Sequence, residues 1–441
     1  MAKQLHEIRD PIHVFVRLDT DERKVLDSRP FQRLRHIHQL ALSYLVYPAA
    51  THRRFEHSLG VMELAGRVFD VVTHKDAVRE EVRRALPEIA NEDALRYWRR
   101  VLRMAALCHD MGHLPFSHAA EKELLPSDWN HERLTREIIL SDEMKIIWES
   151  MTPPVRPLDV VKLAVGPREA KDLTFSTWED ILAEIIVGNS FGVDRMDYLL
   201  RDSHHAGVAY GKFDHFRLID TLRILPTAPS GPDQPPPEPA LGVEDGGIHS
   251  AEALLLARYF MYSQVYFHPI RRIYDIHLKD FLSAWLLGAK FATDLEKHLR
   301  TTDNEVSAAL WEAAHDPTKP GHADAQRIVG HQHFKVLYQR RPDDVAKNPE
   351  AGQVVFEAAK SEFGTENVRH DRYTQKGSAH IFPVLTKDER IAYSVQVSET
   401  LQRLPVVDVD YVFVHPERLG DAERWLRARH DSLIQRTGEA I

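Results

Sequence analysis

The sequence predicts a mainly α-helical protein, with a large helical core and a small α+β subdomain near its C-terminal end. Through most of the first 300 residues, apolar side chains recur at three- and four-residue spacing, which is typical of amphipathic helices. The last third instead contains short runs rich in valine, which are typical of strands. A chain of 441 residues is also too long for one simple core. We therefore assign residues 1–317 to the helical core and residues 318–441 to the α+β subdomain.

The helical pattern begins near Thr20 and continues to about Gly211. The expected helices lie within residues 31–40, 59–72, 98–108, 133–147 and 178–187. Prolines at 153–154 and at 167 separate these helices, without a change in composition that would mark a domain edge. Helical periodicity returns at residues 250–266 and 270–299, so the core is expected to take elements from both sides of the segment between 211 and 250.

That segment includes a stretch rich in proline and glycine, residues 226–247. It contains three consecutive prolines, 235–237, and ends in Gly246 and Gly247, so it cannot be one helix. We expect an extended loop or the tip of a short β-hairpin, with residues 221–225 and 240–243 as the paired strands. In the last third, residues 380–385, 391–395 and 406–414 are expected strands, and residues 421–430 an expected closing helix.

Composition narrows the possible function classes. The formal net charge of -9 argues against a general nucleic-acid backbone binder, although a local basic patch could still hold a nucleotide. The single cysteine, Cys108, excludes an intramolecular disulfide and fits a reducing compartment. The first residues do not resemble a signal peptide, and no apolar run is long enough to span a bilayer. We therefore expect a cytoplasmic protein without a membrane partner.

The most informative motif is the pair His109 and Asp110. It closes the apolar stretch 101–108 and is followed by glycine, proline and two further histidines, His113 and His118. An imidazole and a carboxylate at the end of an otherwise apolar helix indicate a metal site.

Two other segments carry chemistry-bearing side chains. Residues 52–60 place arginines and histidines at the expected start of a helix. Residues 194–205 place Asp194, Tyr198 and Asp202 on one helical face, and Asp197, Arg201 and His204 on the adjacent face. From spacing alone, this second segment is equally compatible with a salt-bridged, solvent-exposed helix.

In their order along the chain, His57, His109, Asp110 and Asp194 resemble the H…HD…D motif of the HD-domain phosphohydrolases. The short sequence motifs at 54–60, 108–113 and 115–118 further resemble those of the deoxynucleoside triphosphate triphosphohydrolase branch, which has a vertebrate antiviral member. The resemblance covers roughly residues 8–277 and implies that these four side chains bind a divalent metal ion. Two imidazoles and two carboxylates suit Mn, Fe, Mg or Ni better than a closed tetrahedral Zn site.

The resemblance also implies catalytic roles. His113, His118 and His131 would face the phosphates, and His118 or His131 would donate a proton to the leaving oxygen. Glu121 would orient His118, and it stands where the family has an aspartate.

The substrate contacts follow from the same resemblance. Arg54, Arg195, Tyr198 and Arg258 would form a cationic cradle, in which Arg195 replaces a lysine of the family. Gln39, Asp202 and Tyr266 would hold the sugar and exclude the ribose 2′-hydroxyl, with Phe267 in place of a glutamine.

A regulatory site is implied at the start of the chain. Asp27, Gln32 and Arg35 match residues that recognise an activating guanine nucleotide at a subunit interface, and Asp and Arg suit a guanine edge. His6 replaces a phosphate-contacting lysine, and the same stretch could simply be the start of an amphipathic helix. The resemblance also implies a homo-oligomer, a dimer or a tetramer, with GTP or dGTP as activator.

Three functions are therefore open. The leading one is metal-dependent hydrolysis of a deoxynucleoside triphosphate to deoxynucleoside and triphosphate. The second is an HD-domain phosphohydrolase acting on nucleoside monophosphates or a signalling nucleotide. The third, of another class, is a non-catalytic nucleotide-sensing or nucleic-acid-binding module. The intact set of expected phosphate-facing histidines, His113, His118 and His131, argues against this third function.

Overall fold

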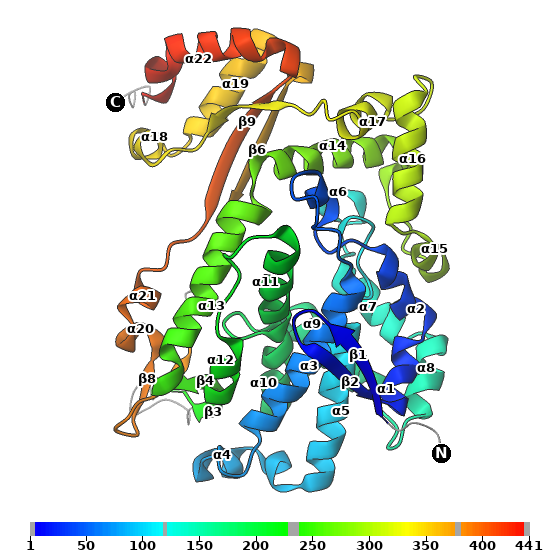
Figure 1. Cartoon of the computed structure of the whole chain (residues 1–441), viewed down its shortest axis with the longest axis vertical. Helices are drawn as coiled ribbons and strands as arrows, with labels where there is room; N and C mark the ends of the chain where they lie inside the picture. Colours follow the sequence, from blue (N-terminus) through cyan, green and yellow to red (C-terminus); the bar gives the residue numbers. More distant parts are fainter. Residues whose placement is uncertain (1–4, 118–120, 228–237, 375–380, 436–441) are drawn as a thin grey trace. The chain divides into compact units, whose positions relative to one another are not determined.

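The computed structural model describes residues 5–117, 121–227, 238–374 and 381–435, and it confirms a mainly α protein with small sheets. The chain forms two compact units (Figure 1). Unit 1 contains residues 1–261, 292–304 and 377–405, and unit 2 contains residues 262–291, 305–376 and 406–441. This division differs from the single boundary after residue 317 that the sequence suggests, because helical periodicity reveals a buried face but not the core that buries it.

Unit 1 holds most of the helices. Its longer helices are α3 (Arg54–Val72), α5 (Glu92–Cys108), α7 (His131–Ile139), α8 (Asp142–Glu149), α9 (Pro157–Glu169), α10 (Thr177–Val187), α11 (Val193–Ala206) and α13 (Ile248–Met261). Its shorter helices are α1 (Thr20–Leu26), α2 (Arg29–Gln32), α4 (Glu80–Ala85), α6 (Glu121–Leu124), α12 (His215–Thr221), α15 (Leu295–Arg300), α20 (Ser394–Val397) and α21 (Glu399–Gln402).

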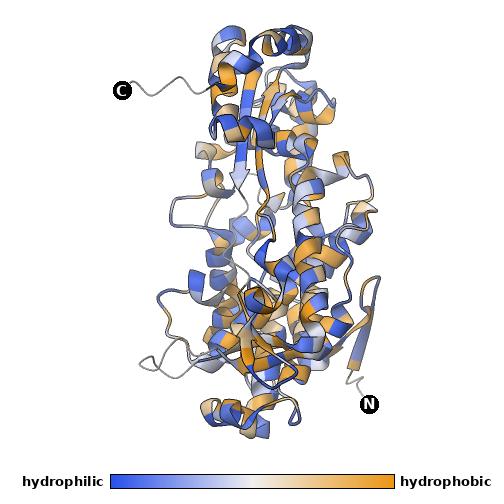
Figure 2. Ribbon diagram, turned by 90° about the vertical axis from the view of Figure 1, so that its left-hand side faces the viewer, coloured by the Kyte–Doolittle hydropathy of each residue, from blue (hydrophilic) through white to orange (hydrophobic). Residues whose placement is uncertain are grey.

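The core of unit 1 forms around α3, which packs against α5, α10 and α11. Apolar side chains on these helices, such as Leu64, Leu107 and Leu182, are completely buried. Figure 2 shows hydrophobic residues mostly on the inner faces of the packed helices. Two caps delimit helices that reach the site: the Asn91 side chain accepts hydrogen bonds at the start of α5, and Gly207, with φ of 72°, ends α11.

Some expected helices differ in detail. Residues 31–40 contain only the end of α2 and a 3-10 turn at Arg33–His36. Residues 133–147 form two helices instead of one, because Ser141 caps a new helix, α8. The expected break at 165–167 is confirmed, because Gly166 has non-helical backbone angles, with φ of 73°, and kinks α9 just before Pro167.

Unit 1 also contains two small sheets. An N-terminal hairpin that the sequence analysis missed pairs β1 (Leu5–Asp10) with β2 (Val14–Asp19). The second sheet has the order β3-β4-β7-β8, and its antiparallel pair β3 (Leu222–Pro226) and β4 (Pro239–Glu244) confirms the expected hairpin. The strand β4 extends one residue beyond each end of the expected strand 240–243, and a 3-10 turn, Asp245–Gly247, follows it.

The strands β7 (Pro383–Leu385) and β8 (Ile391–Tyr393) correct one expectation. The sequence analysis placed both in the C-terminal subdomain, but β7 pairs in parallel with β4, so both strands belong to the sheet of unit 1. Short apolar runs identify strands without identifying their partners.

Unit 2 is an α+β unit with its own core. Its sheet has the order β5-β9-β6, with both pairs antiparallel. The central strand β9 supplies buried Val412, and α19 supplies buried Val355. The elements of this unit are α14 (Pro269–Trp285), α16 (Asp303–His315), α17 (His322–Val329), β5 (Lys335–Gln339), α18 (Pro342–Lys347), α19 (Ala351–Phe363), β6 (Val368–Thr374), β9 (Asp408–Val414) and α22 (Leu419–Ile434).

Among the described residues, no helix combines the length and the apolar character that crossing a membrane requires.

Candidate metal centre

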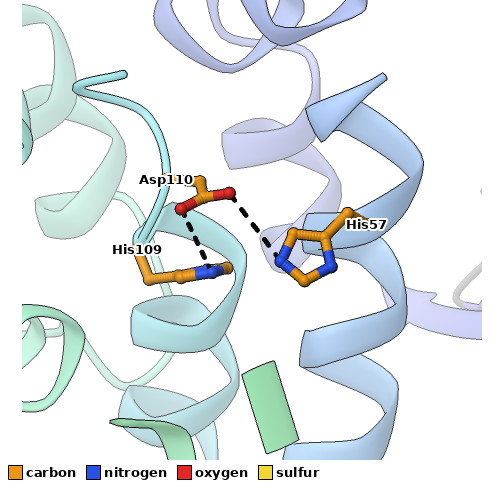
Figure 3. Close-up of side chains that lie close together, drawn as sticks. All are labelled: His57, His109 and Asp110. Atoms are coloured by element: carbon orange, nitrogen blue, oxygen red, sulfur yellow. Dashed lines mark ion pairs between the residues drawn. The ribbon is translucent and has the colours of Figure 1, made fainter. Parts of the chain in front are cut away.

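Two helix ends bring together three side chains in unit 1 that could hold a metal ion (Figure 3). His57 lies in the first turns of α3, whereas His109 caps the C-terminal end of α5 and Asp110 follows it. The His109 Nε2 atom lies 3.3 Å from Asp110 Oδ1, and the His57 Nε2 atom lies 3.7 Å from Asp110 Oδ2. All three residues are buried, and their ligand atoms are close enough to hold one ion.

Asp194 approaches the same point from the start of α11. Its Oδ1 atom lies 3.1 Å from His57 Nε2 and 3.5 Å from His109 Nε2. The four residues singled out by their order in the sequence therefore converge in space.

The orientation of His109 tests whether these residues fit a metal ion. Its Nδ1 atom donates a hydrogen bond to the carbonyl oxygen of Ala106, at 2.8 Å, which leaves a lone pair on Nε2. This Nε2 atom is buried and makes no hydrogen bond to any described residue. A buried nitrogen lone pair beside two carboxylates is the arrangement expected of a divalent metal ligand, so the donor set fits the ion.

The charges of the site favour ionised carboxylates. Burial alone would raise the pKa of Asp110, but Arg54, His109 and His113 hold this pKa well below its usual value. Burial is likewise outweighed at Asp194, where His109 and His57 lower the pKa. For His57, burial would lower the pKa, but hydrogen bonds to Asp194 and Asp197 raise it to about 10. A cation is therefore favoured at this point, and a metal ion would compete with the His57 proton.

Asp197 forms a second layer behind the centre. Its Oδ2 atom accepts a hydrogen bond from His57 Nδ1, at 2.9 Å, which leaves Nε2 to face the other ligands. The sequence analysis noted Asp197 on a helical face but assigned it no role. Its position four residues before Arg201 was the available signal, since such pairs meet on a helix.

A group of imidazoles adjoins the centre. The His113 Nε2 atom lies 3.1 Å from Asp110 Oδ1, and the His113 ring stacks on His131 with 4.0 Å between centroids. Glu121 accepts hydrogen bonds at one oxygen from both the backbone N and the Nδ1 atom of His131, each at 2.7 Å. Glu121 thus contacts His131, whereas the sequence analysis expected it to orient His118, which lies outside the described residues.

The two stacked rings have opposite protonation preferences. Burial, together with the positive charges of Arg54 and His131, holds the pKa of His113 well below its usual value. Burial would also lower the pKa of His131, but the hydrogen bond to Glu121 and the charge of Glu132 raise it. The neutral form is therefore favoured at His113 and the protonated form at His131, where the two rings stack beside Asp110.

The arginines of the expected phosphate cradle occupy two places in unit 1. Arg54 donates to Asp110 Oδ2 at 2.5 Å and to the Ser117 hydroxyl at 2.9 Å. Arg195 donates to the carbonyl oxygen of Gly188 and to the Asn189 side chain, and Arg258 donates to the Asn189 carbonyl oxygen. Arg195 and Arg258 therefore meet at the turn after α10, and Tyr198 lies one helical turn after Asp194 on α11.

Two of the expected sugar-binding residues are linked through His52. Its Nε2 atom lies 2.7 Å from Asp202 Oδ1, and its carbonyl oxygen accepts from the backbone N of Gln39 at 3.0 Å. The Gln39 Oε1 atom is buried and has no hydrogen-bond partner among the described residues. The sequence analysis gave His52 no role. Tyr266 belongs to unit 2, in the π-helical turn Tyr262–Tyr266.

The residues of the expected activator site lie just after α1: Asp27 is its C-cap, Gln32 ends α2 and Arg35 lies in the 3-10 turn that follows. Arg35 donates to Gln32 Oε1 at 2.8 Å, and its guanidinium lies 3.5 Å from the centroid of the Phe55 ring. Asp27 accepts a hydrogen bond from Arg23, which also contacts His6. Asp27 and Arg35 are exposed, so polar groups suited to a guanine edge are accessible on unit 1.

A cavity of about 500 Å³ lies beside α7 and α9. Its wall includes Glu132 but none of the four converging residues. Its arginines are already paired, Arg136 with Asp172 and Arg133 with Asp128. We therefore do not assign the substrate to this cavity.

Comparison with known proteins agrees with this geometry. Residues 54–166 match the HD domain and residues 213–358 match the HD associated region. A solved structure of a hypothetical protein from Aquifex aeolicus is similar, with a TM-score of 0.77 and 31% identity over 96% of this chain and 100% of that chain.

Two sequence relatives are longer than this chain. The deoxynucleoside triphosphate triphosphohydrolase SAMHD1 of Homo sapiens is 29% identical over 366 residues, which cover 75% of this chain and 54% of SAMHD1. The uncharacterized protein YwfO of Bacillus subtilis is 33% identical over 276 residues, which cover 62% of this chain and 54% of YwfO. The chain thus spans about half the length of both relatives.

Proposed function

Because this chain belongs to the HD-domain family, a superfamily of metal-dependent phosphohydrolases, we propose that it hydrolyses deoxynucleoside triphosphates to deoxynucleoside and triphosphate. The observation that carries the proposal is the stack of His113 on His131 directly beside Asp110, in which burial lowers the pKa of His113 and the hydrogen bond to Glu121 raises the pKa of His131. Phosphate ester hydrolysis needs a proton for the leaving oxygen, and His131 can supply one. The similarity to SAMHD1 supports a deoxynucleoside triphosphate as the substrate.

The proposed metal ligands are His57, His109, Asp110 and Asp194. When bound, a divalent ion would lower the pKa of water and neutralise phosphoryl oxygens, and Mn, Fe, Mg, Ni and Zn are the candidates. The protein holds the ligands ready for it, since the Ala106 carbonyl oxygen fixes the tautomer of His109 and Asp197 fixes that of His57.

The proton is handled by His131. Glu121 keeps this imidazole protonated and holds its Nδ1–H, so that the other ring nitrogen can donate. Water attacks the α-phosphorus, and the new P–O bond forms as the bond between the α-phosphorus and the 5′-oxygen breaks. The proton of His131 passes to the 5′-oxygen, so the deoxynucleoside leaves, while the water oxygen stays on the triphosphate and the proton that water loses restores protonated His131. His118 is the second proposed donor. His113 remains neutral and donates its Nε2–H to Asp110, which holds the carboxylate in place.

The remaining residues select the substrate in this proposal. Arg54, Arg195, Arg258 and Tyr198 neutralise and hold the triphosphate. Gln39 and Asp202, both in unit 1, hold the sugar, and the unpartnered Oε1 of Gln39 offers an acceptor for a sugar hydroxyl. Activation by GTP or dGTP at Asp27, Gln32 and Arg35, and assembly into a homo-oligomer, belong to the same proposal.

The test is product analysis. Protein loaded with Mn²⁺ is incubated with each dNTP and NTP, with and without GTP, and the products are resolved by anion exchange. We expect triphosphate from dNTPs, a weaker reaction with NTPs, and stimulation by GTP. Release of phosphate or pyrophosphate instead of triphosphate would refute the proposal.

A pair of variants isolates the metal chemistry. Asp194→Ala should abolish hydrolysis, because it removes a carboxylate next to both imidazoles. His370→Ala is the matched control, since it breaks a comparable His–Asp pair, 2.7 Å long, between β6 and β9 of unit 2. Unchanged turnover in Asp194→Ala would contradict metal catalysis at this centre.

A further inference from the structure

The carboxylate of Asp197 is completely buried and accepts four hydrogen bonds. Its Oδ2 atom accepts from His57 Nδ1 at 2.9 Å and from Arg201 Nε at 2.8 Å. Its Oδ1 atom accepts from His13 Nε2 at 2.6 Å and from Arg201 Nη2 at 3.0 Å. Each oxygen thus receives two donors, so the orientation of this carboxylate is determined from three elements of unit 1: the N-terminal hairpin, α3 and α11.

Asp197 transmits this orientation to His57. Because it accepts the proton on Nδ1, it fixes both the tautomer and the plane of the imidazole, and it directs Nε2 toward Asp110 and Asp194. Carboxylates in this position orient metal-bound histidines and raise their basicity.

His13 is itself held firmly in the turn of the N-terminal hairpin, which connects the end of β1 at Asp10 to the start of β2 at Val14. The Oδ1 atom of Asp10 accepts from the backbone N atoms of Ile12 and His13, both at 2.8 Å. Its Oδ2 atom accepts from Arg201 Nη1, also at 2.8 Å. The turn and α11 are therefore joined twice, through Arg201 to Asp10 and through Asp197 to His13.

The adjacent helix leaves room for this network. Gly60 lies one turn after His57 on α3, and a Cβ atom there would lie 1.9 Å from Asp197 Oδ1 and 2.5 Å from Arg201 Nη2. Only glycine at this position leaves room for the Asp197 carboxylate that contacts His57 and for the Arg201 guanidinium that binds this carboxylate.

We propose that His13 is a positioning residue of the metal centre: the turn of the N-terminal hairpin, acting through Asp197, holds His57 and thereby sets the affinity for the divalent ion. The inference rests on the metal centre of the proposed function and deepens it, but it does not depend on which nucleotide is hydrolysed. It gives the N-terminal hairpin a role, since releasing residues 10–13 would weaken metal binding at a centre that they do not touch.

The experiment measures Mn²⁺ affinity of the full chain by chelator competition, and thermal unfolding of the metal-free protein. His13→Ala removes the donor to Asp197, and we expect affinity to fall roughly tenfold. Asp197→Asn places an amide where two donors converge, and we expect a loss of roughly 100-fold. His13→Gln keeps an N–H of similar reach and should recover most of the affinity lost in His13→Ala. His370→Ala serves as the control.

A second readout separates positioning from fold stability. In His13→Ala, the Mn²⁺ concentration that gives half-maximal hydrolysis should rise by the same factor as the dissociation constant, while kcat at saturating Mn²⁺ stays within about threefold of wild type. Wild-type affinity in His13→Ala would overturn the inference. So would weak binding in His13→Gln when its thermal stability is restored, or a wild-type chain that binds no Mn²⁺. A wild-type chain that binds Mn²⁺ but releases no triphosphate would refute the proposed function, and the affinity comparison would still decide the role of His13.

Discussion

Replacing Gly112 by alanine should impair the site without removing any functional group. Gly112 lies two residues after Asp110 and packs against the start of α7. A Cβ atom there would lie 2.1 Å from the carbonyl oxygen of His131 and 2.3 Å from the backbone N of Thr135. These are helical backbone atoms, which cannot rotate away. Ordinary contact begins at 3.4 Å, so α7 and the segment carrying Asp110 must separate by 3.4 minus 2.1, or 1.3 Å.

This displacement predicts the size of the effect. His131 begins α7, so it would move away from Asp110 and from its stack on His113. A misplacement of about 1 Å can reduce activity about 100-fold, and overpacking costs about 1 to 3 kcal/mol of stability. We expect Gly112→Ala to remain folded, with kcat/KM for dNTP hydrolysis reduced about 100-fold.

The matched control is Gly207→Ala at the end of α11. A Cβ atom there meets nothing within 4 Å, but the φ of 72° is unfavourable for alanine. It should cost about 1 kcal/mol of stability, with activity unchanged. Thermal unfolding and steady-state kinetics on both variants would separate strain from displacement. A folded Gly112→Ala protein whose kcat/KM lies within threefold of wild type would refute the reasoning.

Two further predictions concern titrating carboxylates. Glu121→Gln removes the charge that raises the pKa of His131, so the protonated ring should be lost at lower pH, and the alkaline limb of the kcat profile should move to lower pH. An unmoved limb would exclude His131 as the proton donor. Burial raises the pKa of the Glu184 carboxyl from 4.5 to about 7. With respect to this group, the folded protein is therefore most stable below the unfolded pKa of 4.5, where the carboxyl is protonated. That stability is lost as the pH rises through the folded pKa, because the buried carboxyl must then ionise. Between pH 5 and pH 8, Glu184→Gln should therefore gain up to about 3 kcal/mol over wild type in denaturant unfolding, and a pH-independent difference would contradict the burial argument.

Local patterns predicted the helices of unit 1 well, because each of these helices has its own apolar face. Residues 59–72, 98–108 and 178–187 all lie within helices of the structure. The pairing of strands was less accessible. The β7 strand pairs with β4, about 140 residues earlier in the chain, and no local pattern records a contact between such distant segments. The hairpin β1–β2 was missed for a different reason, since its exposed and buried residues do not produce a clear apolar alternation.

For the site as well, the order of residues along the chain was predictable, but the contacts between side chains were not. The sequence predicted that His57, His109, Asp110 and Asp194 belong together because their types and order are distinctive, and the structure brings them together. It could not predict that Glu121 would bind His131. Sequence spacing favoured His118, three residues earlier, whereas the contact depends on how the start of α7 returns to α6.

The network around Asp197 shows why such contacts matter to the chemistry. A buried imidazole that must present Nε2 to a cation needs an acceptor at Nδ1, and a buried acceptor carrying a full negative charge needs donors of its own. Arg201 satisfies part of that need from the same helix, at a spacing visible in the sequence. The remainder comes from His13, 184 residues away, and its contribution is possible only because Gly60 leaves the space open. The four proposed metal ligands thus stand out in the sequence by their types and order, while the side chains that orient them are defined by the fold.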